Sequence, residues 1–370
     1  MSGDVPWWVT DTVSVKKYDV DWHASMQQSF EFYKVDPNTW RDTEKITEVE
    51  SCSITRDSTA QTLGSASFDV GCSLDECYVR VYLVTIQNDY TNRFVLGTFL
   101  LQSPTEKFDG KRTSYTYDAY TPLMELKESY PPIGYSVLKD TEIMPLASNI
   151  CREHMRAPVV ASSATKTLYS DFVSELSDTW LSFLNDFVAN ANYSLGLDEM
   201  GQVIFEPVVD TASLQPVKEF TDDNSSILLP DLQDDRDLYG IPNVVEVVYS
   251  ADSGYLYSKV TNDDVSSPIS TVNRGREIVY RDSSPSFNGT PTQEIVDAYA
   301  KQLLREKSCL EHTVTFEHAY YPVRIGDAVM LNYKRAGLKN VIAKITSQTI
   351  KCSTGCTIQE TATYTTKLWR

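Results

Sequence analysis

An alternation of apolar and polar side chains with a period of two constrains the fold more than any other feature of the chain. Six segments with this alternation, separated by Asn, Asp, Gly and Pro turns, cover residues 29–35, 47–57, 65–70, 77–86, 93–103 and 113–120. Successive side chains of a β-strand point to opposite faces, so this period is typical of strands with one buried face. Residues 1–121 are therefore predicted to form an antiparallel β-barrel or sandwich.

The period changes after Thr121. Thr141 is expected to cap a helix that ends near Pro158, and apolar residues spaced by three or four predict a second helix over residues 170–191. The segment "NYSLGLDEMGQVIFEP" then predicts a hairpin with its turn at residues 198–201. Residues 122–207 are therefore predicted to form an α/β domain.

The rest of the chain returns to strands around one further helix. Strands are predicted at "NVVEVVY" and "HTVTFEH", and in the meander that begins at Tyr320 and turns at Gly337. Thr290-Pro291-Thr292-Gln293 predicts the start of a helix, with Thr290 as its cap. The whole chain is thus predicted to be an α+β protein dominated by β-structure.

The charge excludes some classes of function. The 51 acidic residues against 33 Lys and Arg give a net charge of −18, whereas a protein that grips nucleic-acid phosphates needs clustered bases. The same charge suits anionic membranes poorly, and no apolar stretch approaches the length of a membrane span. The start "MSGDVPWWV" lacks a basic region and a long apolar core, so no secretory leader is expected.

Catalytic and metal-binding signatures are weak. The sequence contains no Gly-x-Ser-x-Gly, phosphate-loop, Gly-x-Gly-x-x-Gly or His-Glu-x-x-His motif, so neither catalysis nor a cofactor is indicated. Cys72 and Cys77 could close a zinc site with Cys352 and Cys356 if the two segments met, but ordinary semi-buried thiols are favoured. An odd number of scattered cysteines, seven, favours reduced thiols.

Histidines and aromatic residues are assigned mainly to packing. His154, His312 and His318 are expected to be packed side chains rather than ligands or bases, since each lies on an element with apolar neighbours. The pair Trp7 and Trp8 is different, because two large rings in an arm without periodicity must be buried somewhere. Burial on a neighbouring chain and burial on the chain's own barrel are equally compatible with the sequence.

The order of these elements carries a resemblance. The segments "SCSITRDSTAQTLGSASFDV", "RVYLVTIQNDYTNRFVLGTFLLQSP", the helix with "YSLGLDEMGQVIFEP", "DLYGIPNVVEVVYSADSG", "TPTQEIVDAYAKQLL" and "YYPVRIGDAVMLNY" follow one another in this order. In this order and pattern the chain resembles the tail hub, or baseplate hub, proteins of tailed bacteriophages and related contractile injection machines. The resemblance covers nearly the whole chain.

The resemblance implies a domain organisation. Hub proteins carry two tube-like β domains with α/β domains between them. Residues 1–121 would be the first tube-like domain, and residues 208–250 with 310–370 the second. Residues 122–207 would be the intervening α/β domain, and residues 251–309 an inserted domain that ends in a helix.

The resemblance also implies binding partners and a position within the phage particle. Hub proteins are homotrimers, so two tube-like domains per subunit make a pseudo-sixfold ring. Such a ring joins the hexameric tail tube or a distal tail ring to a central spike or tip, with the tape measure protein as a further partner, and DNA passes through it without specific binding. We therefore expect a structural protein of the virion, at the distal end of the tail and assembled in the host cytoplasm, with no membrane insertion. Candidate partner-interface residues are Trp7, Trp8 and Trp369.

Residues 219–237 contain seven acids and one base, Arg236. Because apolar residues interrupt the run, a loop flanking a strand is predicted. A channel wall of carboxylates would repel DNA phosphates at short range, although a solvated outer loop is the simpler interpretation. The candidate channel-lining residues are Asp222, Asp223, Asp231, Asp234, Asp235 and Asp237.

Two other classes of function stay open. One is a tail-associated cell-wall hydrolase, for which no residues can be named. The other is a β-rich receptor- or carbohydrate-binding tail protein, which would gather exposed Tyr and Trp in one groove. Many hubs carry a lytic or receptor-binding domain after the second tube-like domain. Here "TATYTTKLW" is the last predicted strand, so hydrolysis is expected of another protein.

Overall fold

A computed structural model describes residues 20–369 except 210–212, 225, 252–253 and 288–289. The chain divides into two compact units. The first unit comprises Met1–Asp231 and Phe316–Thr361, and the second comprises Leu232–Thr315 and Ala362–Arg370. Trp7 and Trp8 lie outside the described residues.

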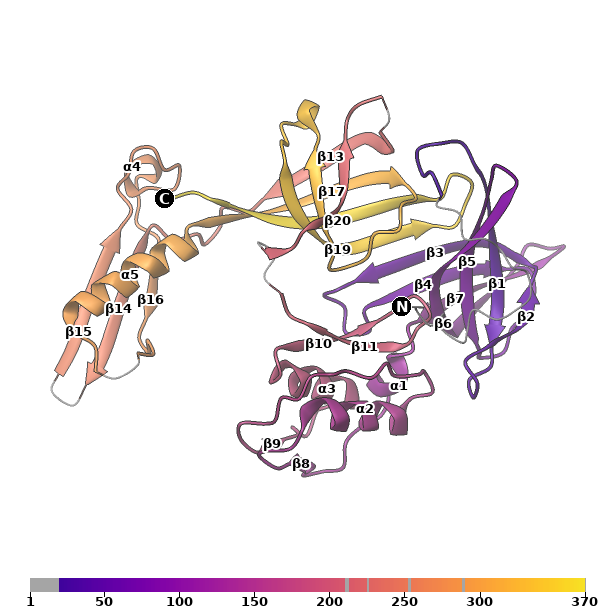
Figure 1. The fold of residues 1–370 in the computed structure, drawn as a ribbon, viewed down its shortest axis with the longest axis horizontal. Helices are drawn as coiled ribbons and strands as arrows, with labels where there is room; N and C mark the ends of the chain where they lie inside the picture. The colour runs from indigo at the N-terminus through magenta and orange to yellow at the C-terminus, as the bar shows by residue number, and fades with distance from the viewer. Residues whose placement is uncertain (1–19, 210–212, 225, 252–253, 288–289, 370) are drawn as a thin grey trace, which may run out of the picture. The chain divides into compact units, whose positions relative to one another are not determined.

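The N-terminal strands form an antiparallel sheet in the order β2-β1-β5-β6-β7-β4-β3 (Figure 1). Six of the seven strands overlap the segments predicted from the period of two, and β2 was not predicted. Phe68, Val81 and Leu96 are almost fully buried in its core. The strands are β1 (Gln27–Val35), β2 (Asp42–Ile46), β3 (Val49–Asp57), β4 (Gly64–Val70), β5 (Tyr78–Gln87), β6 (Tyr90–Phe108) and β7 (Thr113–Tyr120).

The same sheet continues into strands from the C-terminal part of the chain. The antiparallel pairing of β3 with β19 joins the two sets, and the order continues β19-β20-β17-β13, with β18 also on β19 and β12 parallel to β18. The turn between β18 and β19 is at Gly337, as predicted, where a left-handed φ of 82° suits glycine. These elements are β12 (Pro216–Thr221), β13 (Leu228–Arg236), β17 (Cys309–Ala319), β18 (Ala328–Asn332), the short 3₁₀ helix η2 (Lys334–Ala336), β19 (Val341–Lys351) and β20 (Thr357–Lys367).

The α/β part of the first unit packs its helices and a hairpin around one apolar core. The predicted hairpin is present as β10 and β11. The elements are α1 (Met124–Lys127), β8 (Ser136–Val137), α2 (Ile143–His154), β9 (Phe172–Val173), α3 (Trp180–Ala189), β10 (Tyr193–Leu197) and β11 (Val203–Pro207).

The predicted helix over residues 170–191 is wrong in its first half. The helix α3 begins only at Trp180, because the Thr179 side chain caps it and Ser182 completes a capping box. Phe172 lies in β9, but its ring still contacts Phe183, with ring centroids 5.2 Å apart. The apolar residues spaced by four thus belong to two elements, β9 and α3, which share one core.

Two predicted helix caps are also wrong. The helix α2 has Glu142 rather than Thr141 at its N-cap, and Glu142 makes no side-chain cap bond. The helix α5 begins at Gln293, so its N-cap is Thr292 rather than Thr290.

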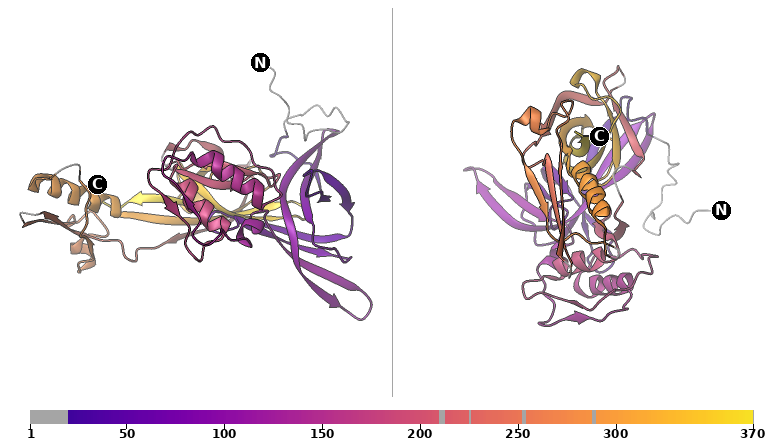
Figure 2. Two further views of the ribbon diagram at one scale, coloured as in Figure 1. Left: turned by 90° about the horizontal axis from the view of Figure 1, so that it is seen from below. Right: turned by 90° about the vertical axis from the view of Figure 1, so that its left-hand side faces the viewer.

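The second unit contains a three-stranded sheet, β15-β14-β16, covered on one face by α5 (Figure 2). Val296, Ala300 and Leu304 of α5 are fully buried in this core. Residues 244–250 were assigned to the second tube-like domain, but they pair here with β15 and β16. The elements are β14 (Val244–Ala251), β15 (Gly254–Thr261), α4 (Thr271–Arg274), β16 (Val279–Asp282) and α5 (Gln293–Lys307).

Candidate functional site

The acidic run, predicted as a loop flanking a strand, forms the end of β12, the loop that follows it and the strand β13. Its residues lie in or beside β12 and β13, and β13 pairs with β17. Pro230 and the charged side chains of β13 suit a strand with one free edge, because they oppose pairing with further chains. Burial alternates along β13, with Asp231 and Asp235 exposed and Asp234 half-buried.

Two of the candidate aspartates have cationic partners. In the first unit, Asp222 accepts hydrogen bonds from the backbone N–H of Arg335 at 3.1 Å and from its guanidinium at 3.3 Å. These bonds hold the pKa of Asp222 below its ordinary value. In the second unit, Asp234 pairs with Arg236 at 2.7 Å and with Nδ1 of His312 at 2.9 Å. The main role of these two carboxylates is therefore to bind neighbouring side chains of the same subunit.

The other candidate aspartates are less restrained. Asp223 accepts a hydrogen bond from the Thr221 hydroxyl, Asp235 accepts one from Gln233, and Asp237 accepts one from the backbone N–H of Tyr239. Within the described part of the chain, Asp231, Asp235 and Asp237 are exposed and form no ion pair with Lys or Arg. These three carboxylates can repel an anion.

The Trp369 side chain packs within the second unit. Its half-buried ring packs against the α5 core, and the Arg305 guanidinium lies 5.7 Å from the ring centroid. The backbone N–H of the adjacent Leu368 donates to Ser308 at 2.9 Å. The role of Trp369 at a partner interface stays a prediction.

The four cysteines considered for zinc contact one apolar core in the first unit. Cys356 is buried in this core, and Cys72, Cys77 and Cys352 pack against it half-buried. No cluster of three or more His, Cys, Asp or Glu that could hold a metal ion occurs among the described residues. The sulfur atoms thus behave as part of a packed core.

The histidines lie among packing partners. His154 stacks on Trp180 with centroids 4.5 Å apart, and His312 stacks on Tyr364 at 4.3 Å. His318 is fully buried, with Nε2 3.2 Å from Oε1 of Glu360. All three rings make packing contacts, and their lack of a role as ligand or base stays a prediction.

An open hollow of about 360 Å³ lies beside α2. It is lined by Glu125, Glu153, His154, Arg156 and their neighbours. The Glu125 carboxylate already accepts hydrogen bonds from the backbone N–H and the guanidinium of Arg156, at 2.7 and 2.6 Å. The Glu125–Arg156 ion pair therefore forms part of the lining of this hollow.

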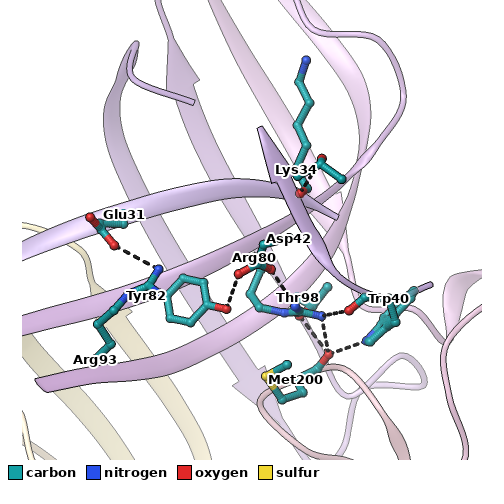
Figure 3. A network of polar contacts seen from close by, with 10 residues as sticks. Glu31, Lys34, Trp40, Asp42, Arg80, Tyr82, Arg93, Thr98 and Met200 are labelled. Carbon is teal, nitrogen blue, oxygen red and sulfur yellow. Dashed lines mark hydrogen bonds and ion pairs between the residues drawn. The ribbon is translucent and has the colours of Figure 1, made fainter. Parts of the chain in front are cut away.

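A buried polar network around Arg80 was missed by sequence reasoning (Figure 3). Arg80 is 1% exposed, and its guanidinium donates to Asp42 at 2.6 Å and to Thr98 at 2.9 Å. The carbonyl of Met200, in the β10–β11 turn, accepts hydrogen bonds from the Trp40 indole and the Thr98 hydroxyl. A charged residue within the apolar run "YVRVYLV" was the available signal.

The exposed aromatic residues come from several parts of the described chain, and none of them lines the hollow beside α2. Tyr90 and Phe108 lie at the two ends of β6, Tyr255 and Tyr257 on β15, and Tyr280 on β16, while the others lie in loops. The exposed Phe and Tyr residues are Tyr90, Phe108, Tyr130, Tyr169, Tyr239, Tyr255, Tyr257 and Tyr280.

Comparison with solved structures places this architecture among known folds. A tail protein from Neisseria meningitidis MC58 matches 91% of this chain and 96% of its own, with a TM-score of 0.61 and 12% identity. The 43 kDa tail protein of prophage MuSo2 from Shewanella oneidensis matches 91% of this chain and 98% of its own, with a TM-score of 0.59 and 11% identity. The chain has the fold of these two tail proteins. The predicted resemblance is thereby confirmed at the level of the fold.

A chain of the PdpA-VgrG complex is also similar, with a TM-score of 0.51 and 9% identity over 92% of this chain and 65% of that one. No protein-family profile and no curated protein sequence matches this chain. In the part of the chain that the structure describes, no helix is long and apolar enough to cross a membrane.

Proposed function

We propose that this protein is a structural tail hub of a phage particle. Three copies would form a ring at the distal end of the tail, between the hexameric tail tube or a distal tail ring and a central spike or tip. The observation that carries the proposal is the match in fold to two tail proteins over nearly the full length of all three chains. The match to a chain of the PdpA-VgrG complex supports a place beside a spike.

The sheet topology supports a ring of alternating β domains. One copy contributes the seven strands from β1 to β7 and, across the β3–β19 ladder, a second set from the C-terminal part. Two sets in each of three copies would give six positions facing a sixfold tube. Among the described strands, β2, β12 and β13 each pair on one side only, so their other edges can meet neighbouring copies.

The acidic strand β13 fits a duct for DNA. Exposed carboxylates at Asp231, Asp235 and Asp237 would repel phosphates within roughly 8 to 10 Å at physiological salt. DNA would then slide past without binding. The tape measure protein is a further partner in the same lumen, and the ring would be assembled in the host cytoplasm before it becomes part of the virion.

Cross-linking within purified particles tests the proposed partners. We expect lysine and acidic residues of this chain to cross-link to the tube protein and to the spike protein in the same preparation. Cross-links to receptor-binding fibres alone, or cell-wall lysis by the isolated chain in a turbidity assay, would contradict the proposal.

A further inference from the structure

Two cysteines lie directly opposite each other where the N-terminal and C-terminal strands meet. The β3–β19 ladder pairs Ser53 with Lys351, and the next residues in register are Cys52 and Cys352. The backbone N–H of Cys352 donates to the carbonyl of Cys52 at 3.0 Å. The pair is therefore a hydrogen-bonded one, in which the Cα atoms of opposite residues are roughly 5.5 Å apart, a separation that a disulfide can bridge.

The two side chains share one environment. Cys52 is buried in the core of the first unit, and Cys352 packs against the same core half-buried. The neighbouring Cys52 thiol, together with burial, raises the pKa of Cys352 above its ordinary value. Little thiolate is therefore present at neutral pH.

This pair closes a junction between distant parts of the chain. The five pairs from Ser347 with Asp57 to Lys351 with Ser53 make the backbone ladder of the junction. The Arg56 guanidinium adds a hydrogen bond to the Gln348 side chain at 3.1 Å. A covalent link here would join residues about 300 positions apart, and a link across so long a segment restrains the unfolded chain strongly.

We propose that Cys52 and Cys352 are a redox-sensitive pair that forms a disulfide across the β3–β19 junction when the protein meets a small-molecule disulfide oxidant. The inference does not depend on the proposed hub function. Cell and virion surfaces are oxidising, whereas the cytosol keeps thiols reduced, so such a pair would close after the protein leaves the cytosol.

The reaction balances by thiol–disulfide exchange with glutathione disulfide. The half-buried Cys352 loses its thiol proton to water, and its thiolate attacks one sulfur of glutathione disulfide. A mixed disulfide forms, and one glutathione leaves as thiolate. Cys52 then gives its proton to the released glutathione thiolate and attacks the Cys352 sulfur, forming the protein disulfide and releasing the second glutathione as thiolate, which takes a proton from water. The protein loses two protons and two electrons, and the oxidant takes up both to give two glutathione molecules.

The test is native oxidation of the full chain followed by peptide mapping. The protein is incubated with glutathione disulfide at pH 7 and at pH 9, alkylated, digested and analysed by mass spectrometry without reduction. We expect one linked peptide pair that contains Cys52 and Cys352, formed several-fold faster at pH 9 because thiolate is more abundant there. The thermal unfolding midpoint should rise by several degrees and return after reduction with dithiothreitol.

Alanine variants separate this pair from its neighbours. Cys52→Ala and Cys352→Ala should each abolish the linked peptides and the thermal shift, whereas Cys356→Ala, which removes a buried thiol of the same core, should retain both. Circular dichroism confirms that each variant is folded. Recovery of Cys52 and Cys352 as free thiols, as separate glutathione adducts, or linked to other cysteines would overturn the proposal.

Discussion

At the scale of single residues, Arg80 explains how the hairpin turn is held against the first sheet. Its buried guanidinium lies between Asp42 of β2 and Thr98 of β6, and the same group of side chains binds the carbonyl of Met200. A buried charge is costly unless it is paired and fully hydrogen-bonded. The position of the turn and the position of β2 are therefore coupled through one side chain.

Replacing Arg80 by Met should be strongly destabilising. The change leaves Asp42 without its cation, and because the Asp42 side chain is 25% exposed we expect a loss of about 2 to 3 kcal/mol in the free energy of unfolding. Urea unfolding followed by tryptophan fluorescence measures it. Lys34→Met is the control, since it removes the exposed Lys34–Glu44 pair and should cost less than about 1 kcal/mol. Equal losses for the two variants would contradict a special role for Arg80.

Asp198 and Asp69 should respond to pH with opposite signs. Burial raises the pKa of Asp198, so the folded state binds its proton more tightly and this residue's contribution to stability falls as pH rises through that window. Hydrogen bonds from Ser51 and Thr116 lower the pKa of Asp69, so its contribution is present at neutral pH and is lost on acidification.

The corresponding variants give the measurement. Relative to the parent chain, Asp198→Asn should be more stable at pH 7 and Asp69→Asn less stable, and both differences should shrink toward pH 3. Urea unfolding at a series of pH values follows the two curves. Curves of the same sign would show that one of these two assignments is incorrect.

At the scale of elements, the start of α3 depends on a local capping box. Thr179 accepts a hydrogen bond from the backbone N–H of Ser182, and the Ser182 hydroxyl accepts one from the backbone N–H of Thr179. Thr179→Ala should cost about 1 kcal/mol in unfolding free energy. Thr141→Ala is the matched control, because Thr141 does not cap α2 and its removal should cost less than about 0.5 kcal/mol. A larger effect at Thr141 than at Thr179 would reverse this interpretation.

Local patterns predicted most strands but not their partners. The period of two located β1 and β3 to β7 but missed the short strand β2. The apolar run "NVVEVVY" of β14 is compatible with the large sheet and with the three-stranded sheet. Its pairing with β15 and β16 depends on contacts between separate segments, which a local pattern does not show. The same limit applies to the acidic segment, where pairing with β17 and β18 outweighs the low strand preference of Asp.

The candidate site was predictable only in part. The acidic composition of residues 219–237 indicated a negative surface, and the exposed Asp231 and Asp235 agree with it. Asp234 pairs with Arg236 two residues away, but Asp222 pairs with Arg335, far along the chain, and no local pattern shows that partner. The opposite position of Cys52 and Cys352 likewise depends on strand register.

At the scale of the whole molecule, the proposed hub function depends on two sets of strands in one chain. Their junction at β3 and β19 lets a single subunit present β-structure twice. A ring built from such subunits can match a sixfold tube with three copies, and its other side keeps threefold symmetry for a spike.

The most direct measurement is an electron cryo-microscopy reconstruction of the tail tip from intact particles. The proposed hub function predicts three copies of this chain around the axis, with six β domains at approximately equivalent positions against the tube. A ring with six copies, or with one β domain of each copy facing the tube, would contradict it.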